Sequence, residues 1–160
     1  MYKLYAKQKV FKILDSYQIF DEDHNPVYQV DQDFTFIGHR LHVEKLGSDF
    51  SFVINKRVPT LLASYSVDFS DGTGFDVEQE FTLFRKKIDV ISDYYQLNLI
   101  GDIWSLDFDI INGEDCVGHI EREWLAWGDT FTITVYDSVF EEELVALMIV
   151  VDYLIDQAQR

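Results

Sequence analysis

The chain has 160 residues, 48% of them hydrophobic, and a formal net charge of −16. This length and composition predict one domain with a substantial core, which excludes the intrinsically disordered class. The negative charge repels phosphate backbones, so we expect no nucleic-acid partner. The single cysteine, Cys116, has no intrachain disulfide partner, and the N-terminal residues do not match a signal peptide. Both observations favour a cytoplasmic protein.

The N-terminal segment, residues 2–10, predicts a strand with its basic side chains on one face. Lys3, Lys7 and Lys9 all have odd numbers, and successive side chains of a strand point to opposite faces. The three lysines would therefore share a face with Tyr5, opposite the apolar residues between them.

Alternating apolar and polar residues recur up to residue 135 and predict half-buried antiparallel strands. The alternation is clearest at 41–43, 65–67, 106–110 and 130–135. Turn-forming sequences separate the strands, at 21–26, 46–49, 70–74, 112–115 and 127–129. Residues 88–95 fit either a strand or a helix. One strand and turn in every 8–12 residues gives about a dozen strands before the C-terminal segment.

The C-terminal segment contains eight consecutive residues without a polar side chain, residues 144–151. This run is too short to span a membrane, which takes about 20 mostly apolar residues, and Asp152 and Asp156 prevent its extension toward the C-terminus. A strand is one alternative, because residues 148–151 are of types favoured in sheets.

Three features favour a helix over residues 139–158. Ser138 and Glu141 have the spacing of a capping box, in which each side chain bonds the backbone N–H of the other residue. Three glutamates, at 141–143, lie in the first turn, where the helix dipole favours negative charge. Arg160 lies at the opposite end, where the dipole favours positive charge.

This helix would be apolar on all sides over two turns, so other parts of the chain must surround it. An eight-stranded barrel is filled by its own side chains, whereas a larger barrel has room for a central helix. We therefore predict a mainly β fold, a closed antiparallel barrel of about twelve strands around a buried hydrophobic C-terminal α-helix. Residues 1–160 would form a single domain, with 139–158 as the central helix.

Several segments, in order along nearly the whole chain, resemble the LURP-one-related family, as does the apolar C-terminal helix. The segments are KQKVF (7–11), YQIFDEDHNPVYQV (17–30), GxxLHV (38–43), PTLLASYSV (59–67), RKK (85–87), LIGDIWSLDFDI (99–110), VGHIEREW (117–124) and TFTITVYD (130–137). The resemblance implies a fold like that of the tubby C-terminal domain and the phospholipid scramblases, a twelve-stranded barrel around a hydrophobic helix.

The resemblance also suggests functions, because better-known relatives of the family bind phosphoinositides or act at membranes. Our first hypothesis is a non-enzymatic cytoplasmic binding or scaffold module whose partner, a phospholipid head group or a protein, is unknown. The alternative is a binder of phosphoinositide or other anionic lipid head groups, and a third hypothesis is a small-molecule-processing enzyme. The candidate anionic-ligand contacts are the scarce basic residues Lys7, Lys9, Lys56, Arg57, Arg85, Lys86 and Lys87. These residues could instead form ordinary surface ion pairs with the many acids.

The acidic turn at 21–26 begins like a calcium-binding loop. Asp21, Asp23 and Asn25 match its first three ligand positions. The pattern then fails, because Pro26 stands where a glycine is needed and Gln32 where the bidentate glutamate belongs. We therefore expect a tight acidic hairpin.

The other candidate site residues do not form a recognisable pattern. Cys116 and His119 are three residues apart, as are His39 and His42, and odd spacing on a strand points side chains to opposite faces. The sequence contains no CxxC, HExxH or GxSxG motif. We expect no metal site, no cofactor and no catalytic residue. The tryptophans would line either the core or a ligand slot: Trp104, Trp124 and Trp127.

Overall fold

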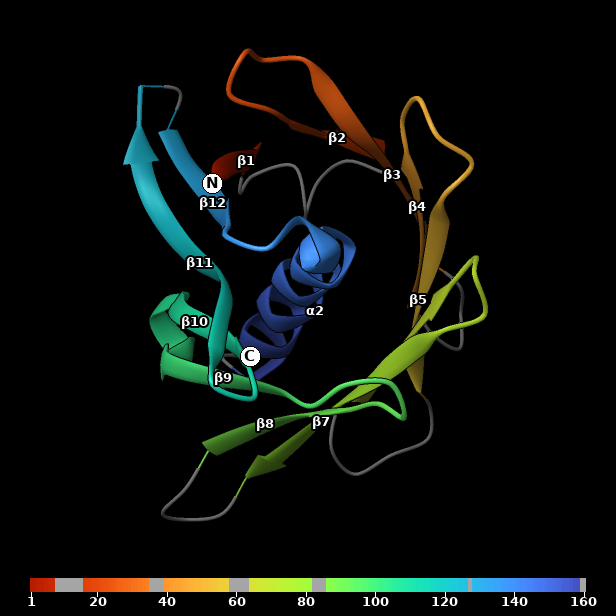
Figure 1. The fold of residues 1–160 in the computed structure, drawn as a ribbon, viewed down its shortest axis with the longest axis vertical. Helices are drawn as coiled ribbons and strands as arrows, with labels where there is room; N and C mark the ends of the chain where they lie inside the picture. The colour runs from red at the N-terminus through yellow and green to blue at the C-terminus, as the bar shows by residue number, and fades with distance from the viewer. Residues whose placement is uncertain (8–15, 35–38, 58–63, 82–85, 127, 159–160) are drawn as a thin grey trace.

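The computed structural model describes residues 1–7, 16–34, 39–57, 64–81, 86–126 and 128–158, in which twelve strands surround one α-helix (Figure 1). The strands are β1 (Tyr2–Lys7), β2 (Ser16–Phe20), β3 (Pro26–Phe34), β4 (His39–Lys45), β5 (Ser51–Arg57), β6 (Ser64–Phe69), β7 (Gly74–Phe81), β8 (Lys86–Ile91), β9 (Leu97–Asp102), β10 (Asp107–Asn112), β11 (Asp115–Leu125) and β12 (Gly128–Val135). Two 3₁₀ turns, η1 (Ile103–Ser105) and η2 (Ser138–Phe140), precede β10 and the helix α2 (Glu141–Ala158). The predicted mainly β fold is confirmed, and the ambiguous segment at 88–95 begins within strand β8.

All twelve strands belong to one antiparallel sheet. Its order is β8-β7-β6-β5-β4-β3-β2-β1-β12-β11-β10-β9, so β8 and β9 are its two ends. The sheet curls around α2 until β8 and β9 lie near each other (Figure 1). The predicted barrel of about twelve antiparallel strands around a C-terminal helix is therefore confirmed, and the barrel is nearly closed.

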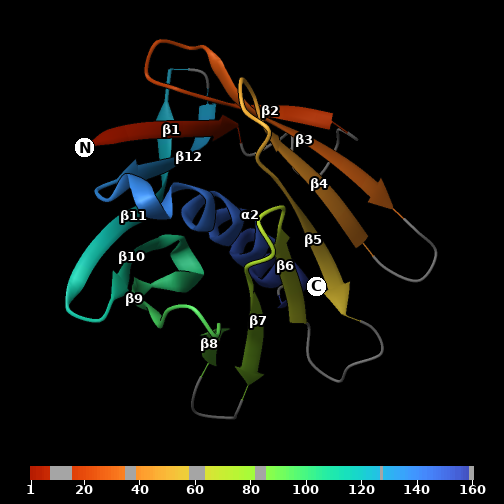
Figure 2. The same ribbon diagram turned by 45° about the vertical axis from the view of Figure 1, so that its right-hand side comes forward.

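The helix α2 occupies the centre of the barrel, as Figures 1 and 2 show from two directions. Every side chain from residue 144 to residue 151 is 0% exposed, so the apolar run has no solvent-facing side. Alternate residues of the strands supply the surrounding wall, and Phe108 and Ile110 of β10 are examples of fully buried inward side chains. No helix among the described residues is long and apolar enough to cross a membrane.

A glycine allows the first turns of α2 to approach the sheet closely. A Cβ atom added to Gly118 of β11 would lie 2.5 Å from Cδ1 of Leu144 and 3.0 Å from the carbonyl oxygen of Thr134. A larger residue here would push the helix away from the sheet or force Leu144 to repack.

The beginning of α2 differs from the prediction. Residues 138–140 form the 3₁₀ turn η2, so the α-helix begins at Glu141 and not at residue 139. The predicted capping box between Ser138 and Glu141 is wrong, because Asp137 caps η2 by accepting a hydrogen bond from the Val139 N–H. The Glu141 carboxylate instead contacts residues that are distant in the sequence, so its spacing from Ser138 does not predict these contacts.

Glu141 anchors the start of α2 to three strands. Its carboxylate accepts hydrogen bonds from the hydroxyls of Tyr2 and Tyr28 and lies 3.0 Å from the Lys45 ammonium. Burial raises the pKa of Glu141, but the bonds from the two tyrosines and Lys45 outweigh it and hold the pKa below its ordinary value. Lys45 also contacts Glu142 at 2.8 Å. A buried charge satisfied in this way holds the helix at one height within the barrel.

Replacing a buried residue of α2 by an acid tests the enclosure. Ile149→Asp places an unpaired charge where the side chain is 0% exposed, which costs several kcal/mol, and we expect the variant not to fold. The matched control is Val139→Asp, the same kind of change in a residue that is 74% exposed, which should melt like the parent. Circular dichroism melting of both variants measures the difference, and an Ile149→Asp variant that melts normally would contradict the enclosure.

Glu143 in the first turn should make stability depend on pH. Its Oε2 is buried without a hydrogen-bond partner among the described residues, and burial raises its pKa from 4.5 to about 7, with a further rise from Glu142. Because the folded-state pKa exceeds the unfolded one, the contribution of the protonated Glu143 side chain to stability is complete below pH 4.5 and is lost as the pH rises through 7.

Glu143→Gln removes this loss of stability at high pH, because the glutamine side chain does not ionise. With allowance for its partial exposure, we expect the variant to be about 1–2 kcal/mol more stable than the parent above pH 7 and equal to it at acidic pH. Thermal melts at both pH values measure this difference, and Glu114→Gln in the exposed β10–β11 turn serves as the control. A stability difference that does not change with pH would contradict the assignment.

Candidate functional site

The barrel has a second weak seam, between β1 and β2. Among the described residues a single ladder pair joins these strands, Tyr5 with Phe20. By contrast, β1 pairs with β12 over all six of its residues. Among the described residues, the ladder that β1 forms with β2 is therefore much shorter than the one it forms with β12.

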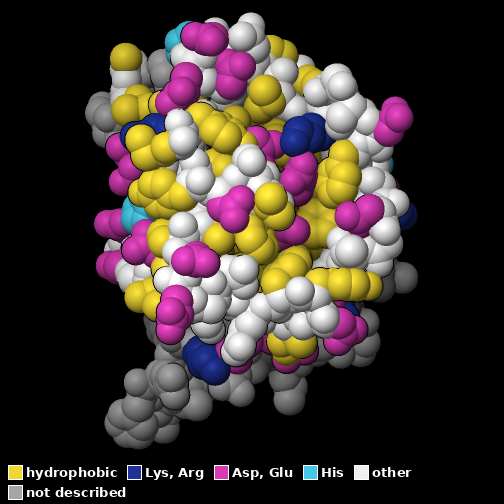
Figure 3. Space-filling model, in the orientation of Figure 1, with side chains coloured by type: hydrophobic (Ala, Val, Ile, Leu, Met, Phe, Trp, Pro, Cys, Tyr) yellow, Lys and Arg dark blue, Asp and Glu magenta, His cyan; other side chains and the backbone are white. Residues whose placement is uncertain are grey.

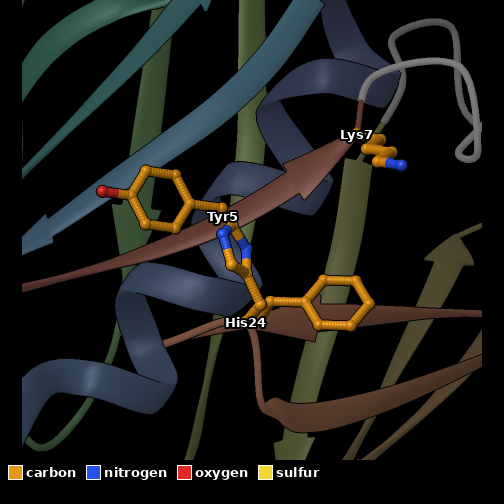
Figure 4. Close-up of a pocket in the computed structure, with 4 residues that line it drawn as sticks. Tyr5, Lys7 and His24 are labelled. Atoms are coloured by element: carbon orange, nitrogen blue, oxygen red, sulfur yellow. The ribbon is translucent and has the colours of Figure 1, made fainter. Parts of the chain in front are cut away.

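A cavity of about 240 Å³ opens at this seam, and Figure 4 shows the described residues that line it. Tyr5 and Lys7 come from β1, Phe20 ends β2, and His24 lies in the turn between β2 and β3. The two aromatic side chains of the strands are half-buried, and Lys7 and His24 are exposed. The lining is mainly apolar, with one ammonium and one imidazole at its edge.

The turn that carries His24 is shaped by Asp21. The Asp21 carboxylate accepts hydrogen bonds from the backbone N–H groups of Asp23 and Asn25, each at 2.9 Å. These bonds, the Asn25 bond above all, lower the pKa of Asp21. His24 has a φ of +63°, in the left-handed region that histidine tolerates better than most residues. The predicted acidic hairpin is confirmed, and its geometry points His24 toward the seam.

The predicted basic residues are distributed over three strands. Lys7 ends β1, Lys56 and Arg57 end β5, and Lys86 and Lys87 begin β8. Strand β5 is four positions from β1, which is about 19 Å along the sheet at the usual strand spacing. Strand β8 is three positions beyond β5, about 14 Å further along the sheet. Two further members of the set lie outside the described residues: Lys9 and Arg85.

Two of these basic side chains have acidic partners on the surface. The guanidinium of Arg57 lies 2.6 Å from Asp76, and the ammonium of Lys87 lies 2.7 Å from Asp89. Figure 3 shows many acidic and few basic side chains on the face that it displays. Of the described members of the set, Lys7 alone lines the seam cavity. Anionic-ligand binding by the whole set stays a prediction.

The tryptophans and the cysteine are the remaining candidates from the sequence. Trp104, in η1, is half-buried and packs against the core, and the side chains of Trp124 and Trp127 lie outside the described part of the chain. Cys116 is exposed, and its thiol contacts the Gly118 carbonyl oxygen at 3.5 Å. Burial and then the nearby Asp109 carboxylate raise the pKa of this thiol, which disfavours the nucleophilic thiolate.

The protein is thus of the class in which a nearly closed antiparallel barrel encloses a C-terminal helix, and it has a small cavity at a strand seam. The family model described as LURP-one-related matches residues 2–152, so the chain belongs to the LURP-one-related family. The uncharacterized protein YxjI of Bacillus subtilis (strain 168) is 25% identical over 158 residues, which cover 97% of this chain and 94% of that protein. No solved structure matches the chain at a significant level.

The resemblance seen in the sequence is therefore confirmed, but the seam cavity was not foreseen from the sequence. Lys7 was predicted as a ligand contact, whereas Tyr5, Phe20 and His24 were not. These residues are brought together by the pairing of β1 with β2, and no local motif signals that contact.

Proposed function

We propose that the chain is a non-enzymatic binding module, in a cytoplasmic setting, that holds a small amphiphile with one anionic group in the seam cavity. The observation that carries this proposal is the lining of the cavity, in which the rings of Tyr5 and Phe20 form apolar walls and Lys7 stands at the edge. Binding sites for small molecules combine mainly apolar walls with a few polar groups that orient the ligand.

Each part of the lining has a role in this proposal. The half-buried aromatic side chains take up the apolar part of the ligand, whose burial is favourable by about 25 cal/mol per Å². The Lys7 ammonium pairs with the anionic group, and the His24 imidazole is a further hydrogen-bonding group at the same opening. A ligand with both parts uses the whole lining, whereas a purely polar anion uses Lys7 and His24 only.

The size and charge of the site favour a small monoanion over a phosphoinositide head group. The volume of about 240 Å³ is below the roughly 300–1,000 Å³ of sites for drug-sized ligands. A head group with several phosphates needs several converging cations, but Arg57 and Lys87 have acidic partners and lie on other strands. The net charge of −16 adds a repulsion that grows with the charge of the ligand.

The same lining favours binding over catalysis. Its described side chains are two aromatic rings, a lysine and a histidine, and the nearby Asp21 carboxylate is engaged by the backbone N–H groups of Asp23 and Asn25. Cys116 lies on β11, and its raised thiol pKa disfavours nucleophilic chemistry at neutral pH.

Octanoate, a small carboxylate with an apolar chain, is the probe for this proposal. Titration of octanoate into ¹⁵N-labelled protein should shift the amide signals of Tyr5, Phe20 and His24. Lys7→Gln should weaken octanoate binding by at least about tenfold, since a hydrogen bond to a charged group contributes about 1.5–3 kcal/mol. Octanol, which has the same chain without the charge, should bind the parent and the Lys7→Gln variant equally.

Lys87→Gln is the matched control, because it removes a lysine ammonium outside the cavity and should leave octanoate binding unchanged. Octanoate that shifts signals elsewhere, or that binds Lys7→Gln as tightly as the parent, would overturn the proposal. Sedimentation with phosphoinositide-containing vesicles tests the alternative function, which requires that Arg57→Gln and Lys87→Gln both reduce vesicle binding.

A further inference from the structure

Four ionisable side chains gather on the outer face of the β10–β11 hairpin, which strand β12 separates from the seam strand β1. Asp107 and Asp109 project from β10, and His119 and Glu121 project from β11. The ladder pairs Asp107 with Glu121 and Asp109 with His119, and directly paired residues have Cβ atoms about 4.5–5.5 Å apart. The opposite face of this hairpin is buried in the core through Phe108, Ile110 and Ile120. The four side chains therefore stand on a rigid support.

Three of these residues bring potential metal ligands together. The Nε2 atom of His119 lies 3.0 Å from Oδ1 of Asp107 and 3.8 Å from Oε2 of Glu121. One ligand atom from each of the three residues lies within 4.8 Å of the other two. Neighbouring ligand atoms bound about 2.0–2.2 Å from one ion are separated by about 2.8–3.6 Å in octahedral or tetrahedral geometry. The separation between His119 and Asp107 falls in this range, and that between His119 and Glu121 lies slightly above it.

We propose that Asp107, His119 and Glu121 bind a divalent transition-metal ion of the zinc type on the outside of the barrel. One imidazole nitrogen and two carboxylate oxygens suit zinc and its neighbours, whereas magnesium and calcium prefer oxygen ligands alone. Three protein ligands leave at least one coordination position for water or a further ligand.

Asp109 orients the histidine for this role. Its carboxylate lies 2.8 Å from Nδ1 of His119, the ring nitrogen that does not face Asp107. When Nδ1 carries the proton, its N–H donates a hydrogen bond to Asp109. The lone pair of Nε2 then faces the carboxylates of Asp107 and Glu121. Histidines that bind metals commonly donate their other N–H to a carboxylate in this way. A cation bound between His119 Nε2 and the carboxylates of Asp107 and Glu121 offsets the repulsion between these groups. Asp109 does not contact the ion in this proposal and is a positioning residue.

The charges around the hairpin strengthen the attraction for a cation. Glu123, two residues from Glu121 on β11, lies on the same outer face, and Lys3 of β1 is a nearby cation. Glu123 itself accepts a hydrogen bond from the Thr132 hydroxyl at 2.7 Å. The carboxylates thus outnumber the cations on this face, and a divalent ion reduces their mutual repulsion.

This arrangement was absent from the sequence analysis because its ligands come from two strands. The pairs considered there, Cys116 with His119 and His39 with His42, were local in sequence. The informative signal is an alternating DxD at 107–109 followed across the NGED turn by HxE at 119–121. Alternate residues of both arms point outward, and antiparallel pairing sets them opposite each other.

Isothermal titration of the metal-free protein with Zn²⁺ at neutral pH tests the proposal. The parent should bind one Zn²⁺ per chain and should melt at a higher temperature with Zn²⁺ than with an equal concentration of Mg²⁺. His119→Gln and Glu121→Gln should each lose this binding. Asp109→Asn, which removes the orienting carboxylate, should weaken it about 10- to 100-fold.

The control is His42→Gln, because His42 lies 3.3 Å from Glu44 on β4 in a simple histidine–carboxylate pair. This variant should bind Zn²⁺ like the parent, and melts of every variant without metal show that each one folds. The ¹⁵N shift of His119 Nε2 in the parent distinguishes a coordinated ring from a protonated one. Failure of the parent to bind Zn²⁺, unchanged binding by His119→Gln, or a ring that stays protonated would overturn the proposal and assign His119 to an imidazolium ion pair.

Discussion

The structure depends on the enclosure of an apolar helix. Residues 144–151 have no exposed side, so α2 exists as a helix in water only if the rest of the chain covers it completely. Twelve strands provide that cover, because a smaller barrel would be filled by its own side chains. The close approach at Gly118 and the buried carboxylate of Glu141 adjust the position of the helix within this wall.

Because α2 fills the barrel, both proposed sites lie outside the core, one at a seam and one on an outer face. The interior of a hollow barrel can hold a ligand, but here the centre is occupied by α2 and the side chains packed on it. The seam between β1 and β2 holds a small cavity that Tyr5 and Phe20 help to line. The β10–β11 hairpin instead presents an outer face on which His119 lies among carboxylates. The two proposed sites thus rest on different parts of one rigid wall.

The elements that follow from local patterns were predictable from the sequence. Alternation revealed the strands, and the apolar run with its acidic first turn revealed the helix, because burial imposes these periods on the residues themselves. The capping at Ser138 was mispredicted because Glu141 bonds Tyr2 and Tyr28, which are distant in sequence. The cavity of Tyr5 and Phe20 and the cluster of Asp107 and His119 depend on strand register, which one sequence does not specify over long separations.

Native-state hydrogen exchange of the α2 amides tests the enclosure most directly. If the helix is sheathed on all sides, the amides of residues 144–151 exchange only when the whole barrel opens. Their opening free energy should then equal the free energy of global unfolding measured with denaturant. Exchange of these amides at the rate of exposed turns such as 112–115, under conditions where the strands remain protected, would contradict the account.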